Sequence, residues 1–125
     1  MKRIFISFAI EDKSLRDLLK GQSKNENSPF EYIDMSAKVP WDSKWKTNCR
    51  TRIKSCDGVI AIVTKNTKYA DGQLWEIKCA KEEHIPIIGI YGCENHIFAT
   101  IPSDCGYIRI MNWSWPNISN WLDLL

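Results

Sequence analysis

The chain has 125 residues, a length that suits a single domain, and its 44% of hydrophobic residues can build a real core. The formal net charge of +2 gives no sign of a nucleic acid or an anionic membrane as a partner. No apolar run approaches the length of a membrane span, and the N-terminus lacks a signal-peptide cleavage site. The five cysteines are odd in number and have no metal-ligand spacing, so we expect free thiols, no metal site and a reducing cytoplasm.

The first part of the chain has the pattern of a strand, a helix, a loop and a second strand. Residues 3–8 (RIFISF) and 30–34 (FEYID) are rich in Ile, Phe and Tyr, which predicts strands. Between them, Gly, Ser, Asn and Pro mark residues 21–29 as a loop. The helix before this loop begins with two acidic residues and has three leucines on one face: Glu11, Asp12, Leu15, Leu18 and Leu19.

A second loop and a second helix lead to the most apolar strand. The loop covers residues 35–41, and Asp42 or Ser43 then caps a helix. Residues 58–63 form an unbroken run rich in Val and Ile, which predicts a strand buried on both faces. One apolar stripe follows the second helix: Trp45, Cys49, Ile53 and Cys56.

The same alternation continues to the end of the chain. A polar loop follows the third strand, and Asp71 then caps a helix. Ser114 and Pro116 have the spacing of the start of a last helix. We expect a helix over 71–84, a strand over 85–91, irregular chain over 92–103 with one helical turn near 96–100, and a strand over 106–111.

Strands that alternate with helices predict an α/β fold, a doubly wound parallel sheet with right-handed crossovers. For five strands the common flavodoxin-like order is 2-1-3-4-5, and its ligand crevice lies at the carboxyl ends of strands one and three. We therefore expect a substrate-binding site there, built by these residues: Ser7, Phe8, Ala9, Asp34, Met35, Ser36 and Thr64.

Glu76 is the carboxylate that this topology brings to the crevice. At about 100° per residue, Lys78 and Lys81 lie on one side of the third helix and Glu76 on the other, toward the sheet. One interpretation is a first-turn acid that complements the helix dipole and extends to the rim. The other is a partly buried acid at the mouth of a cleft, where catalytic carboxylates lie.

Known sites of this topology do not fit the residues. A receiver domain needs an Asp at the end of the third strand, where this chain has Thr64. A flavodoxin needs a phosphate loop after the first strand, where residues 8–11 are FAIE, and the motifs GxGxxG and GxxxxGKS are absent. A Cys–His nucleophile pair stays open by spacing, although His84 and His96 flank strand four at opposite ends.

One carboxylate surrounded by aromatic rings and hydroxyls suits one kind of bond cleavage. Breaking a nicotinamide–ribose bond gives an oxocarbenium-like centre and needs no general acid, because the leaving ring is already cationic. A carboxylate that binds the ribose hydroxyls and offsets the developing charge would suffice. Phe8 and Trp41 could stack on the substrate or could equally pack in the core.

Three segments resemble the TIR domain. Residues 5–12 (FISFAIED) are similar to its opening box, residues 35–43 (MSAKVPWDS) take the place of its BB loop, and residues 67–83 (TKYADGQLWEIKCAKEE) resemble the stretch that opens its third helix. From residue 3 to about residue 122, the chain resembles the short TIR-like proteins of bacterial Thoeris anti-phage defence, the ThsB proteins.

The resemblance implies an NAD-cleaving enzyme of TIR type that makes a cyclic ADP-ribose isomer or an ADP-ribose conjugate. NAD is then the substrate, no cofactor is needed, and the product activates a separate ThsA-type effector. The catalytic glutamate carries over to Glu76, with Phe8 and Trp41 lining the site. Many catalytic TIRs have a Trp three or four residues earlier, whereas this chain carries Trp75 beside the glutamate, with its ring about 100° away.

The rival expectation is a non-catalytic TIR module that assembles with other TIR domains. Both expectations share the fold and the possibility of self-association. A sheet-facing Glu76 favours the enzyme, because an adaptor has no need of an acid at that position.

Overall fold

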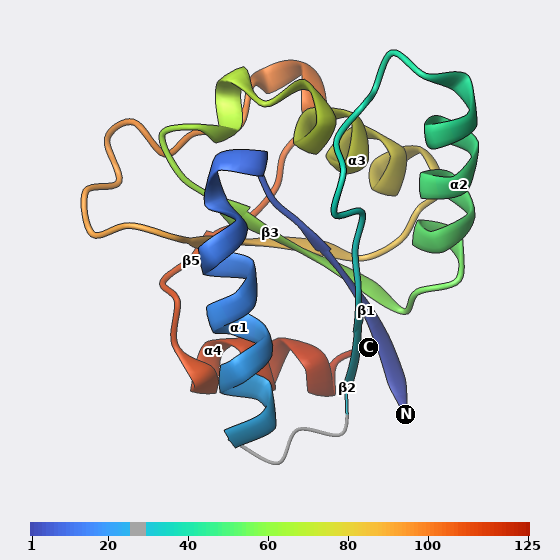
Figure 1. Cartoon of the computed structure of the whole chain (residues 1–125). Coiled ribbons are helices and arrows are strands. Elements are labelled where there is room, and N and C mark those ends of the chain that lie inside the picture. Colours follow the sequence, from blue (N-terminus) through green and yellow to red (C-terminus); the bar gives the residue numbers. More distant parts are fainter. Residues whose placement is uncertain (26–29) are drawn as a thin grey trace.

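A single parallel sheet forms the centre of the molecule. The computed structural model describes residues 1–25 and 30–125, and in these residues the sheet has the strand order β2-β1-β3-β4-β5 (Figure 1). The predicted strand order is therefore confirmed. The strands are β1 (Lys2–Ser7), β2 (Phe30–Ile33), β3 (Gly58–Val63), β4 (Ile87–Tyr91) and β5 (Ile110–Met111).

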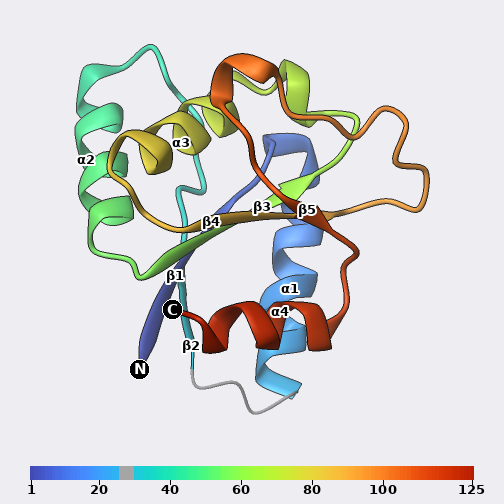
Figure 2. The same cartoon turned by 180° about the vertical axis from the view of Figure 1, so that it is seen from behind.

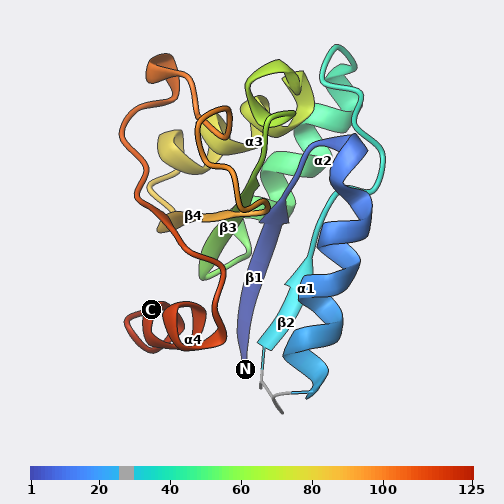
Figure 3. The same ribbon diagram turned by 90° about the vertical axis from the view of Figure 1, so that its left-hand side faces the viewer.

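Helices cover both faces of the sheet. Figures 1 and 2 show α1 and α4 on one face, with α2 and α3 on the other, and Figure 3 shows α2 and α3 above β3 and β4, with α4 below them. Their bounds are α1 (Lys13–Asn25), α2 (Ser43–Lys54), α3 (Asp71–Glu82) and α4 (Trp115–Asp123). Within the described residues, no helix is both long and apolar enough to cross a lipid bilayer.

The two-residue period of the strands divides the core between the two layers. Ile4 and Ile6 of β1 pack in the cluster that includes residues of α1 and α4, whereas Phe5 packs with Trp45 of α2. Every residue of β3 is buried, as its unbroken apolar run predicts. The same alternation decides which side of the sheet each residue at the carboxyl edge faces.

The start of α2 fixes the loop before it. Asp42 is the N-cap, and its Oδ1 accepts hydrogen bonds from the backbone N of Lys44 at 2.8 Å and of Trp45 at 3.1 Å. The indole Nε1 of Trp45 donates to the backbone O of Ala37 at 2.7 Å. The loop between β2 and α2 is thus held at its centre as well as at its end.

The first helix differs from the prediction. It continues through Gly21 to Asn25, where a loop was expected, because Gln22 and Lys24 favour helix and a single glycine weakens a helix without ending it. The rest of the expected loop, residues 26–29, lies outside the described residues. The expected leucine face is also narrower, since Leu18 is 60% exposed.

The C-terminal half differs from the prediction in two details and agrees with it in a third. The fifth strand is limited to Ile110–Met111, which pair with β4 on one side only and so gain little from further extension. Asp71 is the first residue of α3, and Ala70 takes the cap position without a side-chain hydrogen bond. The expected helical turn near 96–100 is a single turn closed by the backbone of Ala99 and His96, at 3.1 Å.

Two glycines make a matched test of the packing. A Cβ on Gly58 would lie 2.6 Å from the Trp121 ring of α4, whereas a Cβ on Gly21 would meet nothing within 4 Å. We expect Gly58→Ala to lower the free energy of unfolding by about 1–3 kcal/mol. Gly21→Ala should raise it by up to about 1 kcal/mol, because alanine favours helix. Denaturant unfolding measures both, and a Gly58→Ala protein as stable as the parent would show that α4 does not rest on β3.

Candidate functional site

Glu76 is a fully buried carboxylate at the carboxyl edge of the sheet. The sequence predicted that it lies in the first turn of α3. It is instead the sixth residue of the helix and lies in the second turn. Its side chain faces β1 and is 0% exposed. Ser7, the last residue of β1, donates a hydrogen bond from Oγ to Glu76 Oε1 at 2.9 Å.

Lys38, from the loop after β2, occupies the other side of the carboxylate. Its Nζ lies 2.6 Å from Glu76 Oε2, and its side chain is only 6% exposed. The same Nζ lies 4.0 Å from the centroid of the Phe8 ring, a cation–π contact. An ammonium group is therefore held between a carboxylate and an aromatic ring.

The environment of Glu76 changes its acidity. Burial raises the pKa of this carboxyl from 4.5 to about 7, and the charge and hydrogen bond of Lys38 and the hydroxyl of Ser7 offset only part of the increase. A carboxyl with a pKa near 7 changes its charge at physiological pH. Perturbed carboxyls of this kind are common in functional sites, although they also occur in structural ion pairs.

Gln73, one helical turn before Glu76, joins α3 to two strand ends. Its Nε2 donates to the backbone O of Ser7 at 3.1 Å and of Ile62 at 2.8 Å. Because both partners are acceptors, the amide orientation is fixed. Within the part of the chain that the structure describes, Gln73 Oε1 is buried and has no hydrogen-bond partner. The site thus contains one acceptor in need of a donor.

Asp34, expected as a substrate-binding residue, is held in an ion cluster. Arg16 Nη1 lies 2.8 Å and Lys20 Nζ 3.2 Å from its Oδ2. Burial would raise the pKa of Asp34, but the Arg16 hydrogen bond and the Lys20 charge outweigh it and hold the pKa below its usual range. Ser36 is exposed and lies 3.5 Å from the other carboxylate oxygen, and Met35 is buried in the core beneath α2.

Thr64 belongs to a second polar cluster at the end of β3. Its Oγ1 donates to Asp12 Oδ2 at 2.5 Å, and Asn66 Nδ2 donates to Asp12 Oδ1 at 2.9 Å. Asp12 ends a short 3-10 turn, Ile10–Asp12, that links β1 to α1. The cluster therefore fixes the loops on either side of the β1 end, next to the buried Ala9.

The two tryptophans of the predicted site lie in different places. Trp41 is 78% exposed and lines a hollow of about 200 Å³, together with Lys38, Tyr69 and Gln73. Trp75 packs against Trp45 of α2, with ring centroids 5.5 Å apart at an interplanar angle of 65°. Trp41 thus lies at the rim of the hollow that Lys38 and Gln73 also line, whereas Trp75 lies between α2 and α3.

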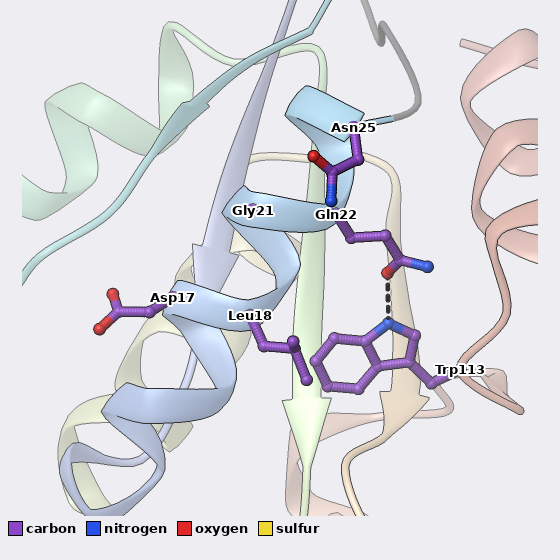
Figure 4. A pocket seen from close by; sticks show the side chains of 6 residues that line it. All are labelled: Asp17, Leu18, Gly21, Gln22, Asn25 and Trp113. Atoms are coloured by element: carbon purple, nitrogen blue, oxygen red, sulfur yellow. Dashed lines mark hydrogen bonds between the residues drawn. The ribbon is translucent and has the colours of Figure 1, made fainter.

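A larger hollow lies away from this site. It has a volume of about 590 Å³ and lies between the end of α1 and Trp113, whose Nε1 donates to Gln22 Oε1 at 2.8 Å (Figure 4). Its lining, which includes Leu18 and Gly21, contains no residue of the predicted site. It lies beside α1 and not at the carboxyl ends of β1 and β3, whereas the hollow lined by Lys38 and Gln73 adjoins the partners of Glu76.

Other chemistries find little support in the described residues. The five cysteines are free thiols, and burial raises the pKa of Cys49 and of Cys79, the latter to about 11, so these two stay protonated at neutral pH. Within residues 1–25 and 30–125, no group of His, Cys, Asp and Glu could hold a metal ion.

The structure brings together Ser7, Phe8 and Glu76, and it adds two residues that sequence reasoning missed. Lys38 is the one charged residue of the 35–41 loop, a signal that the neighbouring Trp41 obscured. Gln73 stands three residues before Glu76 and thus on the same helix face.

The sheet order and the flanking helices define a class of protein, the α/β fold of TIR and SEFIR domains. The crystal structure of a prokaryotic SEFIR domain matches with a TM-score of 0.59 and 14% sequence identity, over 99% of this chain and 96% of that chain. At this identity the likeness shows the fold alone. A search of curated proteins finds no match.

Sequence identifies the family. Residues 5–96 match the family described as "Thoeris protein ThsB, TIR-like domain". The match spans well over half of the chain and includes Ser7, Lys38 and Glu76, so the chain belongs to this family. The resemblance seen in the sequence is confirmed.

The raised pKa of Glu76 predicts a pH-dependent stability. Between pH 4.5 and 7 the folded protein holds a proton that the unfolded chain has lost, so this carboxyl lowers the free energy of unfolding as the pH rises. Glu76→Gln cannot lose that proton. From pH 4.5 to 7.5, we expect its stability relative to the parent to improve by up to about 3 kcal/mol. Denaturant unfolding at both pH values measures this difference, and a constant difference would contradict the raised pKa.

Proposed function

We propose that this protein is a TIR enzyme that cleaves the nicotinamide–ribose bond of NAD and makes an ADP-ribose-derived signal, a cyclic isomer or a conjugate. The observation that carries the proposal is the buried Glu76 carboxylate, held by Ser7 beside the ring of Phe8 at the carboxyl ends of the central strands. In doubly wound sheets this edge is where ligands bind.

The chemistry needs one well-placed negative charge. When the bond breaks, its electron pair stays with the nicotinamide nitrogen, which becomes neutral, and positive charge develops at the ribose carbon. Glu76 would stabilise that charge and bind the ribose hydroxyls. A nucleophile then forms the new bond to the ribose carbon and loses its proton. That the same carboxylate already holds the Lys38 ammonium at 2.6 Å supports a site suited to positive charge.

The family supports the wider setting of the reaction. The proposed product diffuses to a separate ThsA-type effector, and self-association through TIR surfaces is part of the same proposal. NAD enters as substrate and no cofactor is invoked. We place the reaction in the cytoplasm, in keeping with five free cysteines.

One observation favours a second candidate, a non-catalytic TIR interaction module. Glu76 is fully buried in this conformation, while two aromatic side chains that line the hollow next to Lys38, those of Trp41 and Tyr69, are each 78% exposed. Exposed aromatic residues are enriched at protein interfaces. In this alternative the ion pair of Glu76 and Lys38 is structural and the loop surface binds another TIR domain.

A conservative pair of variants separates the two candidates. We expect Glu76→Gln to reduce nicotinamide release from NAD by at least about a hundredfold, because the charge that stabilises the transition state is lost. Glu82→Gln, on the exposed face of the same helix, should match the parent. Chromatography of nicotinamide, with circular dichroism to confirm folding, measures both. A folded Glu76→Gln protein with parental turnover would exclude this residue from catalysis, and a parent that releases no nicotinamide would favour the interaction module.

Trp41 provides a test of the loop. Because its ring is exposed, Trp41→Ala should change the melting temperature by less than about 2 °C while raising KM for NAD several-fold. Trp45→Ala is the matched control, since Trp45 is buried and its loss should unfold or strongly destabilise the protein. If Trp41→Ala lost several degrees with unaltered turnover, the ring would be part of the core and not of a lid.

A further inference from the structure

The ammonium group of Lys38 lies in a ready-made cradle for an organic cation. It contacts the Glu76 carboxylate at 2.6 Å and lies over the ring of Phe8 at 4.0 Å. A carboxylate beside an aromatic face is a standard way of binding a cationic group. What fills this cradle belongs to the chain itself, at the centre of the proposed NAD site.

We propose that the Lys38 ammonium occupies the subsite of the substrate's pyridinium ring, so that the protein in this conformation is blocked by its own side chain. The inference rests on the proposed function, because it assigns a part of NAD to this cradle. It adds a ligand class, planar organic cations of the nicotinamide type, and a residue that competes with them.

The contacts leave no room for a ligand beside Lys38. Both oxygens of Glu76 are engaged, Oε1 by Ser7 and Oε2 by Lys38, and the carboxylate has no exposed surface. A ring can reach the carboxylate only if Lys38 leaves. The adjacent hollow of about 200 Å³, which Lys38 itself lines, then becomes continuous with the cradle.

The close approach of Lys38 to α3 depends on a glycine. A Cβ on Gly72 would lie 2.8 Å from the Cβ of Lys38 and 3.4 Å from its Cγ and Cδ. Because Gly72 has no side chain, the first turn of α3 leaves space through which the aliphatic part of Lys38 passes. The neighbouring Ala37 is held by Trp45, so the loop presents Lys38 to the cradle from a fixed position.

Gln73 indicates which cation fits. It lines the same hollow, and within the described residues its buried Oε1 lacks a donor. A nicotinamide ring carries an amide N–H group beside its positive ring and so offers both a cation and a donor. 1-Methylnicotinamide has these two features and no ribose, which makes it a binding probe that does not depend on catalysis.

The first experiment is a titration by calorimetry. The parent should bind 1-methylnicotinamide weakly, and Lys38→Met at least about tenfold more tightly, because a site that is seldom free lowers the apparent affinity. For uncharged nicotinamide, the affinity of Lys38→Met should exceed that of the parent by less than twofold. Lys38→Arg keeps a cation in place and should stay weak, and Lys44→Met, an exposed lysine next to the loop, should match the parent. A folded Lys38→Met protein with parental affinity for the probe would overturn the proposal.

A second experiment uses the parent and so does not depend on the folding of a variant. Acetylation with a soluble ester, followed by mass spectrometry, should modify the buried Lys38 far more slowly than the exposed Lys44. Saturating 1-methylnicotinamide should displace Lys38 and raise the acetylation rate of Lys38 at least about fivefold, without changing the acetylation rate of Lys44. An unchanged or lower rate at Lys38 would overturn the proposal.

The outcomes also separate this inference from the proposed function. If Lys38→Met binds the probe tightly but neither the parent nor any variant cleaves NAD, the cation subsite is supported and the proposed enzymatic function is contradicted. NAD cleavage with no change in probe affinity would retain the enzyme and assign Lys38 a purely structural role.

Discussion

The buried carboxylate of Glu76 is the constraint on which the functional edge of this molecule depends. An ion buried at full depth costs several kcal/mol unless its oxygens are paired. Ser7 and Lys38 supply those pairs, one from a strand and one from a loop. Three separate elements are thereby tied to one group, so the charge state and occupancy of the carboxylate are coupled to the position of the loop.

The topology explains why these partners meet. The loop that follows β2 leads into α2, and its Lys38 also packs against α3, the helix that follows β3. Because β1 lies between β2 and β3, the loop makes this contact across the end of β1. Lys38 and Glu76 are 38 positions apart in the chain and still meet above Ser7. Gly72 makes that crossing close, since a larger residue would hold the loop away. The crevice that doubly wound sheets leave at this point is here filled by the chain itself.

The periodicity of the sequence predicted most of the fold, whereas the loops predicted little of the site. The alternation of strands and helices predicted the sheet order, and the spacing of α3 predicted that Glu76 faces the sheet, because both follow from regular geometry. The complete burial of Glu76 was not predicted. The predicted end of α1 was wrong, because Gly21 weakens a helix without ending it. Lys38 could not be placed, because a side chain in an irregular loop has no period that gives its direction. The roles of the predicted site residues stay predictions, although three of them meet at one point.

The proposed reaction would carry positive charge through this site, which gives the site a reason to hold a cation at rest. The pyridinium of NAD is cationic before the bond breaks, and the ribose carbon becomes cationic as it breaks, so a fixed carboxylate serves both states. Without any cation, Glu76 would be an unpaired buried charge, and its pKa would rise further until it bound a proton. While the site is closed, Lys38 offsets part of that rise and holds the pKa near 7. The closed loop thus favours the charged form that the proposed chemistry needs, and a ligand that displaces the lysine must replace its positive charge as well as its volume.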